Sequence, residues 1–203
     1  MSKITTPEEL RALYGHPKGR AVTKQMDRLE THSRRFIELS PFLVIATSRT
    51  DGLADASPKG DMPGFVHVLD DHTIAIPDRP GNNRLDSMEN LLANPAIGLI
   101  FFIPGVNETL RINGFAEIRD DTELLARFKV NGKLPKTVYV VTVKEAYLHC
   151  AKALVRSRLW SDEAQAPERP IPTMSRMINE QTVSDVPEET EAEMLARYKK
   201  VLY

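Results

Sequence analysis

The sequence predicts a mainly β protein: a small antiparallel barrel of six or seven short strands with flanking helices. From Phe42 onwards, short apolar β-prone runs alternate with turn signals such as Asp51-Gly52, a pattern typical of hairpins. A single amphipathic helical segment interrupts these runs at residues 84–92. Short antiparallel strands around one inserted helix favour a barrel over a doubly wound parallel sheet. The 203 residues suffice for one domain with a full core.

The first 40 residues are expected to form helices that pack on this barrel. Thr6 suits an N-cap, Pro7 suits the first helical position, and acidic residues follow in the first turn. Glycines at positions 15 and 19 break this helix. A second, longer helix is expected over residues 21–39, and Pro41 marks its end.

Residues 41–160 are expected to form the barrel domain. A helix over 84–92 ends at Asn94-Pro95, and a short helix is expected over 122–128. The expected strands cover residues 42–48, 53–57, 65–69, 73–76, 96–103, 109–118 and 136–149.

Residues 161–203 are expected to be a linker and C-terminal helices. Residues 164–172 contain three prolines, which is typical of an irregular connection. Helices are expected over 174–181 and 187–202, the second with acids at its start and bases at its end, as the helix dipole favours.

Composition excludes several classes of function. The formal net charge is −1, so nothing favours binding to nucleic acid or to an anionic membrane. No window resembles a membrane span or a signal peptide, and a cytoplasmic location is expected. The single cysteine, Cys150, excludes an internal disulfide. No metal site is expected, because the histidines at 16, 32, 67 and 72 lie in separate elements without ligand spacing.

The segment 76–114 carries the clearest chemical signal, an anion site. A turn rich in Pro, Gly and Asn places Arg79, Asn83 and Arg84 at the start of the expected helix. Cationic side chains beside the free N–H groups of a helix N-terminus suit a phosphate. Lys59 is a further candidate cation. The alternatives are solvated loop charges, an Asp78–Arg79 ion pair, and a turn with no binding role.

Two strand positions are also candidates. Pro58, directly after Ser57, is expected to end a ladder in mid-strand and so free backbone groups for a ligand; the alternative is a simple β-bulge. Arg111 lies between Leu110 and Ile112. If these two face the core, Arg111 points outward, toward a dimer partner, a ligand cleft or a surface ion pair.

The order of elements and the residues at their junctions resemble the pyridoxamine-phosphate-oxidase-like flavoproteins, which have the FMN-binding split-barrel fold. The resemblance covers about residues 37–160. Its strongest part is NPAIGLIFFIPGVNETLRING, residues 94–114, which matches the family's Asn-Pro, apolar strand, short loop and second strand ending in Gly without a gap. The family's Arg-Leu-His-Asp-Arg substrate motif is absent, so the resemblance does not extend to oxidation of pyridoxamine phosphate itself.

The resemblance implies roles for particular residues. Ala56, Ser57, Pro58 and Lys59 stand where the family lines the flavin ring and phosphate, and Ile76 and Pro77 stand at the next flavin-facing strand end. Asn83 and Arg84 fall near the family's basic phosphate grip. Thr109 stands where the oxidases have a glutamine that hydrogen-bonds the flavin. Lys152, Arg156 and Trp160, spaced i, i+4 and i+8, could form one helix face that covers the flavin or packs in a dimer.

The resemblance implies a homodimer that binds FMN non-covalently at the subunit interface. The implied activity is transfer of hydride between a reduced nicotinamide and a small acceptor, with no catalytic side chain identified. Two alternatives stay open. One is a non-catalytic flavin or haem carrier on the same barrel, and the other is a deazaflavin-dependent reductase.

Overall fold

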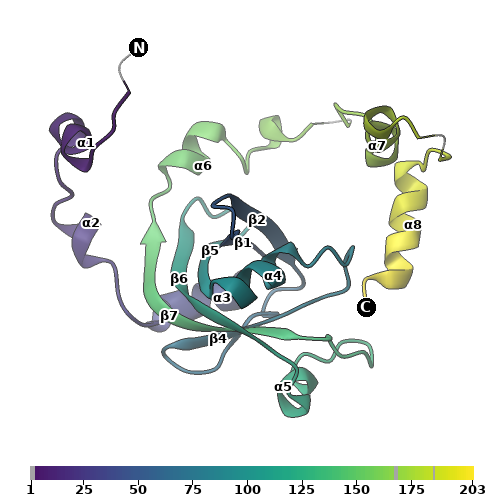
Figure 1. Ribbon diagram of the computed structural model, residues 1–203, viewed down its shortest axis with the longest axis horizontal. Coiled ribbons are helices and arrows are strands. Elements are labelled where there is room, and N and C mark those ends of the chain that lie inside the picture. Colours follow the sequence, from purple (N-terminus) through teal and green to yellow (C-terminus); the bar gives the residue numbers. More distant parts are fainter. Residues whose placement is uncertain (1–2, 167–168, 185) are drawn as a thin grey trace.

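The computed structural model describes residues 3–166, 169–184 and 186–203 and is built around one antiparallel sheet (Figure 1). Part of the expected linker, residues 167–168, lies outside the described residues. The strands are β1 (Phe42–Ser48), β2 (Ala54–Gly60), β3 (His67–Val68), β4 (Thr73–Pro77), β5 (Ala96–Phe102), β6 (Thr109–Arg119) and β7 (Val138–His149). The helices are α1 (Pro7–Tyr14), α2 (Arg20–Thr23), α3 (Thr31–Leu39), α4 (Asp86–Ala93), α5 (Thr122–Ala126), α6 (Lys152–Ser157), α7 (Met174–Thr182) and α8 (Glu191–Val201), with a 3-10 turn over Asp162–Ala164.

The seven strands pair in the order β2-β1-β5-β6-β7-β4-β3, and every ladder is antiparallel. The sheet is not closed: β2 and β3 are its edges, and no ladder joins them within the described residues. The predicted fold class, mainly β with flanking helices on an antiparallel split barrel, is therefore confirmed. β2 runs further than expected, to Gly60, and β3 is shorter than expected.

Alternation along the strands forms the core. In β1 and β5 every second side chain is buried, as expected for strands with one face toward the interior. Their inward rows include Leu43, Ile45, Leu99 and Phe101, all at most 2% exposed. Two helices cover this interior: α3 buries Phe36 and Ile37, and α4 buries Met88 and Leu91.

The expected continuous helix over residues 21–39 is wrong, because the chain is not helical between α2 and α3. Met26 forms a two-way backbone bridge with Ala146, with N···O distances of 3.0 and 2.7 Å. Leu29 is buried, and its N–H donates to the Asp71 carbonyl at 2.7 Å. The Glu30 side chain then accepts from the amides that open α3. Pairing with β7 and burial of Leu29 outweigh local helix propensity here.

The helices nearer the chain ends contribute little to the core. The helices α1, α2, α6, α7 and α8 contain no buried residue. In Figure 1, α1 and α8 stand on opposite sides of the barrel. Thr6 caps α1, with Pro7 and the acidic residues in the first turn as expected, so the local prediction there is confirmed; Glu9 also completes a capping box. The division into three parts at residues 40 and 160 stays a prediction.

A close approach of two backbones fixes the longest ladder. The β6–β7 register shifts between Asn113 and Gly114, as in a β-bulge. A Cβ atom on Gly114 would overlap the Thr142 carbonyl oxygen and lie 3.0 Å from its carbonyl carbon. Only glycine fits at this position without backbone movement.

We expect Gly114→Ala to destabilise the protein by ~1–3 kcal/mol, the usual cost of overpacking, measured by urea unfolding. Gly98→Ala is the matched control on β5, since its added Cβ would meet Asn113 and Ala46 at ordinary distances of 3.5 and 3.7 Å. Equal stability of the two variants would show that the β6–β7 approach is not a constraint.

Candidate functional site

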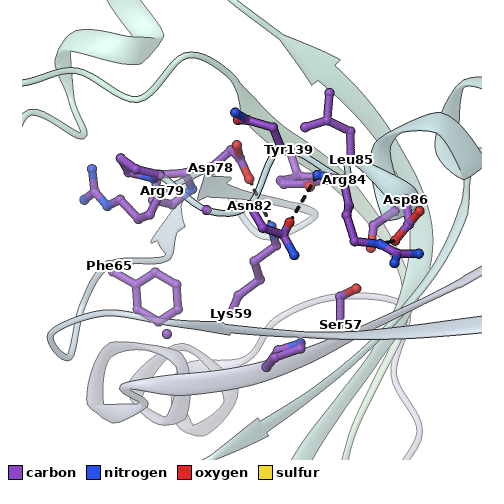
Figure 2. A pocket seen from close by; sticks show the side chains of 17 residues that line it. Ser57, Lys59, Phe65, Asp78, Arg79, Asn82, Arg84, Leu85, Asp86 and Tyr139 are labelled. Carbon is purple, nitrogen blue, oxygen red and sulfur yellow. Dashed lines mark hydrogen bonds and ion pairs between the residues drawn. The ribbon is translucent and has the colours of Figure 1, made fainter. Parts of the chain in front are cut away.

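A pocket of about 430 Å³ opens at the β2 edge of the sheet (Figure 2). Its walls come from the second half of β2, the end of β4, the loop 78–85 and the first turn of α4, with Tyr139 of β7 behind them. In Figure 2, Phe65 and Arg79 lie at one end and Arg84 and Asp86 at the other, with Lys59 between. This volume is within the usual range for small-molecule and cofactor sites.

Strand register explains why β2 presents polar groups here. Lys59, Ser57 and Asp55 pair with Leu43, Ile45 and Thr47 of β1, so they continue the inward-facing rows of the sheet. At the edge strand these rows change from apolar to polar. The inner face of β2 therefore supplies one wall of the pocket.

Three side-chain hydrogen bonds attach α4 to the strands beside it. Ser87 Oγ donates to Asp55 at 3.0 Å, and Asn90 Nδ2 donates to Thr47 Oγ1 at 3.0 Å. Asn94 Nδ2, just past the helix, donates to Ser48 Oγ at 2.8 Å. The start of α4 is thus held against β2, and the loop before it closes the pocket.

The loop 78–85 enters α4 through an unusual backbone. Asn83 and Leu85 have φ of +58° and +59°, the left-handed region that non-glycine residues seldom adopt. Leu85 is the N-cap, and no side chain caps the first turn of α4. Asn82 instead accepts from the Arg84 amide at 3.1 Å. Uncapped first-turn amides favour an anion.

Each of the three cations lining the pocket is paired with an aspartate. Lys59 Nζ is 3.0 Å from Asp78, Arg79 Nε is 2.6 Å from Asp61, and Arg84 Nε is 2.8 Å from Asp86. The Arg84 side chain is 73% exposed, whereas the Asp61 side chain is only 4% exposed. The alternative pairing of Arg79 with Asp78 is wrong, because Asp78 pairs with Lys59 and Arg79 reaches across to Asp61.

Asp61 anchors Arg79 as a structural group. Burial alone would raise the pKa of Asp61, but hydrogen bonds from Tyr203, the Met62 amide and Arg79 outweigh it and hold the pKa below its usual value. Arg79 also donates to the Phe128 carbonyl at 2.8 Å and lies 5.6 Å from the Tyr203 ring centroid. With these partners, Arg79 is fixed in the wall of the pocket.

Lys59 is held between Asp78 and Tyr139. Its Nζ lies 5.2 Å from the centroid of the Tyr139 ring, which is 1% exposed. Burial would lower the pKa of Lys59, but Tyr139 and Asp78 beside it raise the pKa above its ordinary value, so Lys59 is a cation at neutral pH. Burial raises the pKa of Tyr139, so its hydroxyl stays protonated.

The structure brings half of the sequence-predicted site residues together. Those that line the pocket are Ser57, Pro58, Lys59, Pro77, Arg79, Asn83 and Arg84. The others do not line it: Ala56, Ile76, Thr109, Arg111, Lys152, Arg156 and Trp160. Ile76 and Thr109 are buried.

Sequence reasoning missed Phe65, Tyr139 and the aspartate partners. Tyr139 was part of an expected strand, and its pairing with Ile76 of β4 brings it behind the pocket. A polar aromatic residue within a run of valines was the only local signal.

The expected break at Pro58 is wrong. β2 pairs with β1 without a register shift from Ala54 to Gly60, and Pro58 lies opposite Val44, so there is neither a broken ladder nor a bulge. Because β2 is an edge strand, a proline fits it without losing a hydrogen bond to a second neighbour.

The expected helix face of Lys152, Arg156 and Trp160 is also wrong. The helix α6 ends at Ser157, and Arg158 is left-handed, so Trp160 lies beyond the helix. Its Nε1 donates to the Val106 carbonyl at 2.9 Å. Lys152 and Arg156 are exposed on the short helix.

Arg111 points outward, as expected from its buried neighbours Leu110 and Ile112. Its guanidinium lies 5.9 Å from the Tyr147 ring centroid on the neighbouring strand. This contact is of the cation–π type.

No helix in the described part of the chain has the length and apolar character needed to cross a membrane. A search of curated proteins found no match. Among solved structures, the chain is similar to HupZ of Group A Streptococcus, at 20% identity over 59% of this chain and 93% of that one, with a TM-score of 0.48. It is also similar to a Lactobacillus delbrueckii protein proposed to be a pyridoxamine 5'-phosphate oxidase, at 17% identity over 62% and 99%, with a TM-score of 0.49.

A protein-family model matches the central part of the chain. The family model described as pyridoxamine 5'-phosphate oxidase matches residues 29–150, more than half of the chain. The match includes the whole sheet and every residue that lines the pocket. The chain belongs to the pyridoxamine 5'-phosphate oxidase family, a flavin-binding family of the oxidoreductase type.

Proposed function

We propose that this protein binds FMN non-covalently in the pocket between β2 and the loop 78–85 and transfers hydride between a reduced nicotinamide and a small acceptor. The observation that carries the proposal is Arg84, an exposed cation at the uncapped start of α4 on the rim of the pocket. A phosphomonoester is the ligand group that such a pair of features favours.

The remaining wall suits a planar ring. Pro58, Phe65, Pro77 and Tyr139 give the pocket apolar surface. Ser57 and Ser87 both donate their hydroxyl protons to Asp55, at 3.2 and 3.0 Å. Their oxygens are thus left as acceptors, which fits ring N–H groups better than phosphate oxygens.

Bound FMN would supply the redox chemistry, because its ring accepts and returns hydride. The protein's part is to bind and orient it. Arg84 and Asn83 would hold the phosphate, while the apolar wall would exclude water from one side of the ring. Lys59 is tied to Asp78, so it serves as a fixed positive charge rather than as a proton donor. Among the described residues, each ionisable side chain that lines the pocket has a partner, so the cofactor would carry the reaction.

A partly exposed apolar patch supports the proposed homodimer. The patch has three cross-strand rows on the outer face of β2, β1 and β5: Gly60–Phe42–Phe102, Pro58–Val44–Ile100 and Ala56–Ala46–Gly98. None of its side chains is polar, and none of the nine residues is buried. A contiguous apolar surface of exposed and half-buried residues of this kind is typical of interaction sites.

Pro58 and Gly60 belong to both this patch and the pocket wall. A second copy seated on the patch would therefore border the pocket. This continuity supports a cofactor site at the subunit interface, and Ala56, which is on the outer face, would contact the partner rather than the pocket.

The bound cofactor can be identified directly. We expect purified protein to show flavin absorbance, to release a chromophore with the mass of FMN, and to consume NADPH when an electron acceptor is added. A haem spectrum, or tighter binding of added deazaflavin by colourless protein, would reject FMN. Bound flavin without NADPH consumption would indicate a carrier.

Removal of Arg84 should affect FMN binding, whereas removal of Arg79 should affect the stability of the protein. Arg84→Ala should weaken FMN binding by ~1.5–3 kcal/mol, the loss of a charge-assisted hydrogen bond, with little change in riboflavin binding or stability. Arg79→Ala should instead lower the free energy of unfolding by ~1–3 kcal/mol, because it leaves the buried Asp61 without its cation. Calorimetric titration and urea unfolding measure the two effects. Equal, near-zero effects on FMN affinity would reject the phosphate assignment.

The patch can be tested at its centre. Val44→Lys should convert a dimer to monomers in sedimentation experiments, because a charge is placed in the middle of the apolar rows. Thr142→Lys is the control, an exposed strand residue outside the patch, and should leave the dimer intact. A wild-type monomer, or an unaffected Val44→Lys dimer, would contradict the proposed interface.

A further inference from the structure

The three cation–aspartate pairs at the pocket differ in how firmly they are held. Arg79 also donates to the Phe128 carbonyl, and Asp61 also accepts from the Met62 amide and the Tyr203 hydroxyl. Lys59 and Asp78 are mostly buried, with Tyr139 beside them. Arg84 and Asp86 are the most exposed of the three pairs, at 73% and 43% of their side chains.

Arg84 has few restraints besides Asp86. Within the part of the chain that the structure describes, its guanidinium has one hydrogen bond, from Nε to Asp86 Oδ2 at 2.8 Å. This hydrogen bond and the charge of Asp86 raise the pKa of Arg84. The pairing is local, between residues two apart, and needs no other part of the fold. An exposed pair of this kind is weak and can be exchanged for a stronger anion.

Asp86 also lies where an anion at this site would be held. It is the first residue of α4 and lines the pocket together with Arg84 and Leu85. A dianionic phosphate that binds Arg84 must either displace the Asp86 carboxylate or lie close to it. If it lies close, the two negative charges repel each other. Either way the carboxylate opposes phosphate binding.

We propose that Asp86 is an internal competitor for Arg84 that limits the affinity of the site for phosphorylated ligands. The inference rests on the proposed function, because it takes the FMN phosphate to bind at Arg84. The Asp86 carboxylate pairs with the Arg84 guanidinium when no ligand is bound, and the pair forms again when the ligand dissociates. The cofactor is therefore held as an exchangeable ligand, with an affinity that depends on ionic strength.

The test is the affinity of Asp86→Asn for FMN and for riboflavin, which has the same ring without the phosphate. We expect FMN to bind about two- to fivefold more tightly than to the wild type at low salt, corresponding to the strength of an exposed ion pair. Riboflavin affinity should stay unchanged, and the gain for FMN should shrink at high salt. Asp86→Ser is a second variant that removes the charge and keeps a small polar side chain, and it should behave in the same way.

Asp121→Asn is the matched control. Like Asp86, Asp121 lies at the start of a helix, as the N-cap of α5, and pairs with an arginine, Arg119, at 2.7 Å, with 44% of its side chain exposed, but it does not line the pocket. Asp121→Asn removes the same charge as Asp86→Asn and should leave FMN affinity unchanged.

The outcomes separate this inference from the proposed function. If the wild type prefers FMN to riboflavin and Arg84→Ala removes that preference, but neither Asp86 variant tightens FMN, the competition is rejected while the phosphate site stands. Equal tightening of riboflavin, or an equal gain in Asp121→Asn, would also reject it. A wild type that does not distinguish FMN from riboflavin would overturn both.

Discussion

The attachment of α4 to the edge of the sheet is the constraint on which the site depends. Hydrogen bonds from Ser87 to Asp55, from Asn90 to Thr47 and from Asn94 to Ser48 hold the helix along β1 and β2. Together with burial of Met88 and Leu91, they place the first turn of α4 beside the polar inner row of β2. The loop before α4 has to close the remaining distance, and it does so through left-handed Asn83 and Leu85. Left-handed non-glycine backbone costs free energy, which the surrounding contacts must offset.

Charge compensation is the second property of the site. Three cations line the pocket, yet each has an aspartate partner. The pocket is therefore close to neutral, and its attraction for an anion depends on which pairs can open. Burial decides which pairs can open. Removing one partner of a buried pair leaves an uncompensated buried charge and costs stability, whereas the partners of an exposed pair can exchange for water and ions. The buried Arg79–Asp61 pair thus stabilises the wall, and the exposed Arg84–Asp86 pair can respond to a ligand.

Much of the fold could be predicted from local patterns, whereas the partners within the site could not. The apolar, β-prone run over 42–48 and the capping signals around Thr6 are properties of neighbouring residues, and the strand and the helix start that they predict agree with the structure. The bridge at Met26 could not be predicted, because its partner Ala146 lies far along the chain. The same holds for Asp61 beside Arg79 and for Tyr139 beside Lys59. The prediction of a broken ladder at Pro58 was wrong for a related reason. The effect of a proline depends on whether β2 has one neighbouring strand or two, and only the order of strands in the sheet decides this.

The position of β2 at the edge of the sheet links the proposed ligand site to the proposed dimer interface. An edge strand with unpaired backbone groups is exposed to pairing with other chains, and proteins commonly cover such edges. Here the inner face of β2 contributes Ser57 and Lys59 to the pocket, while its outer face contributes Ala56, Pro58 and Gly60 to the apolar patch. A ligand on one face and a second copy on the other would therefore contact the same seven-residue strand. The proposed ligand site and the proposed interface would therefore be expected to be thermodynamically linked through β2.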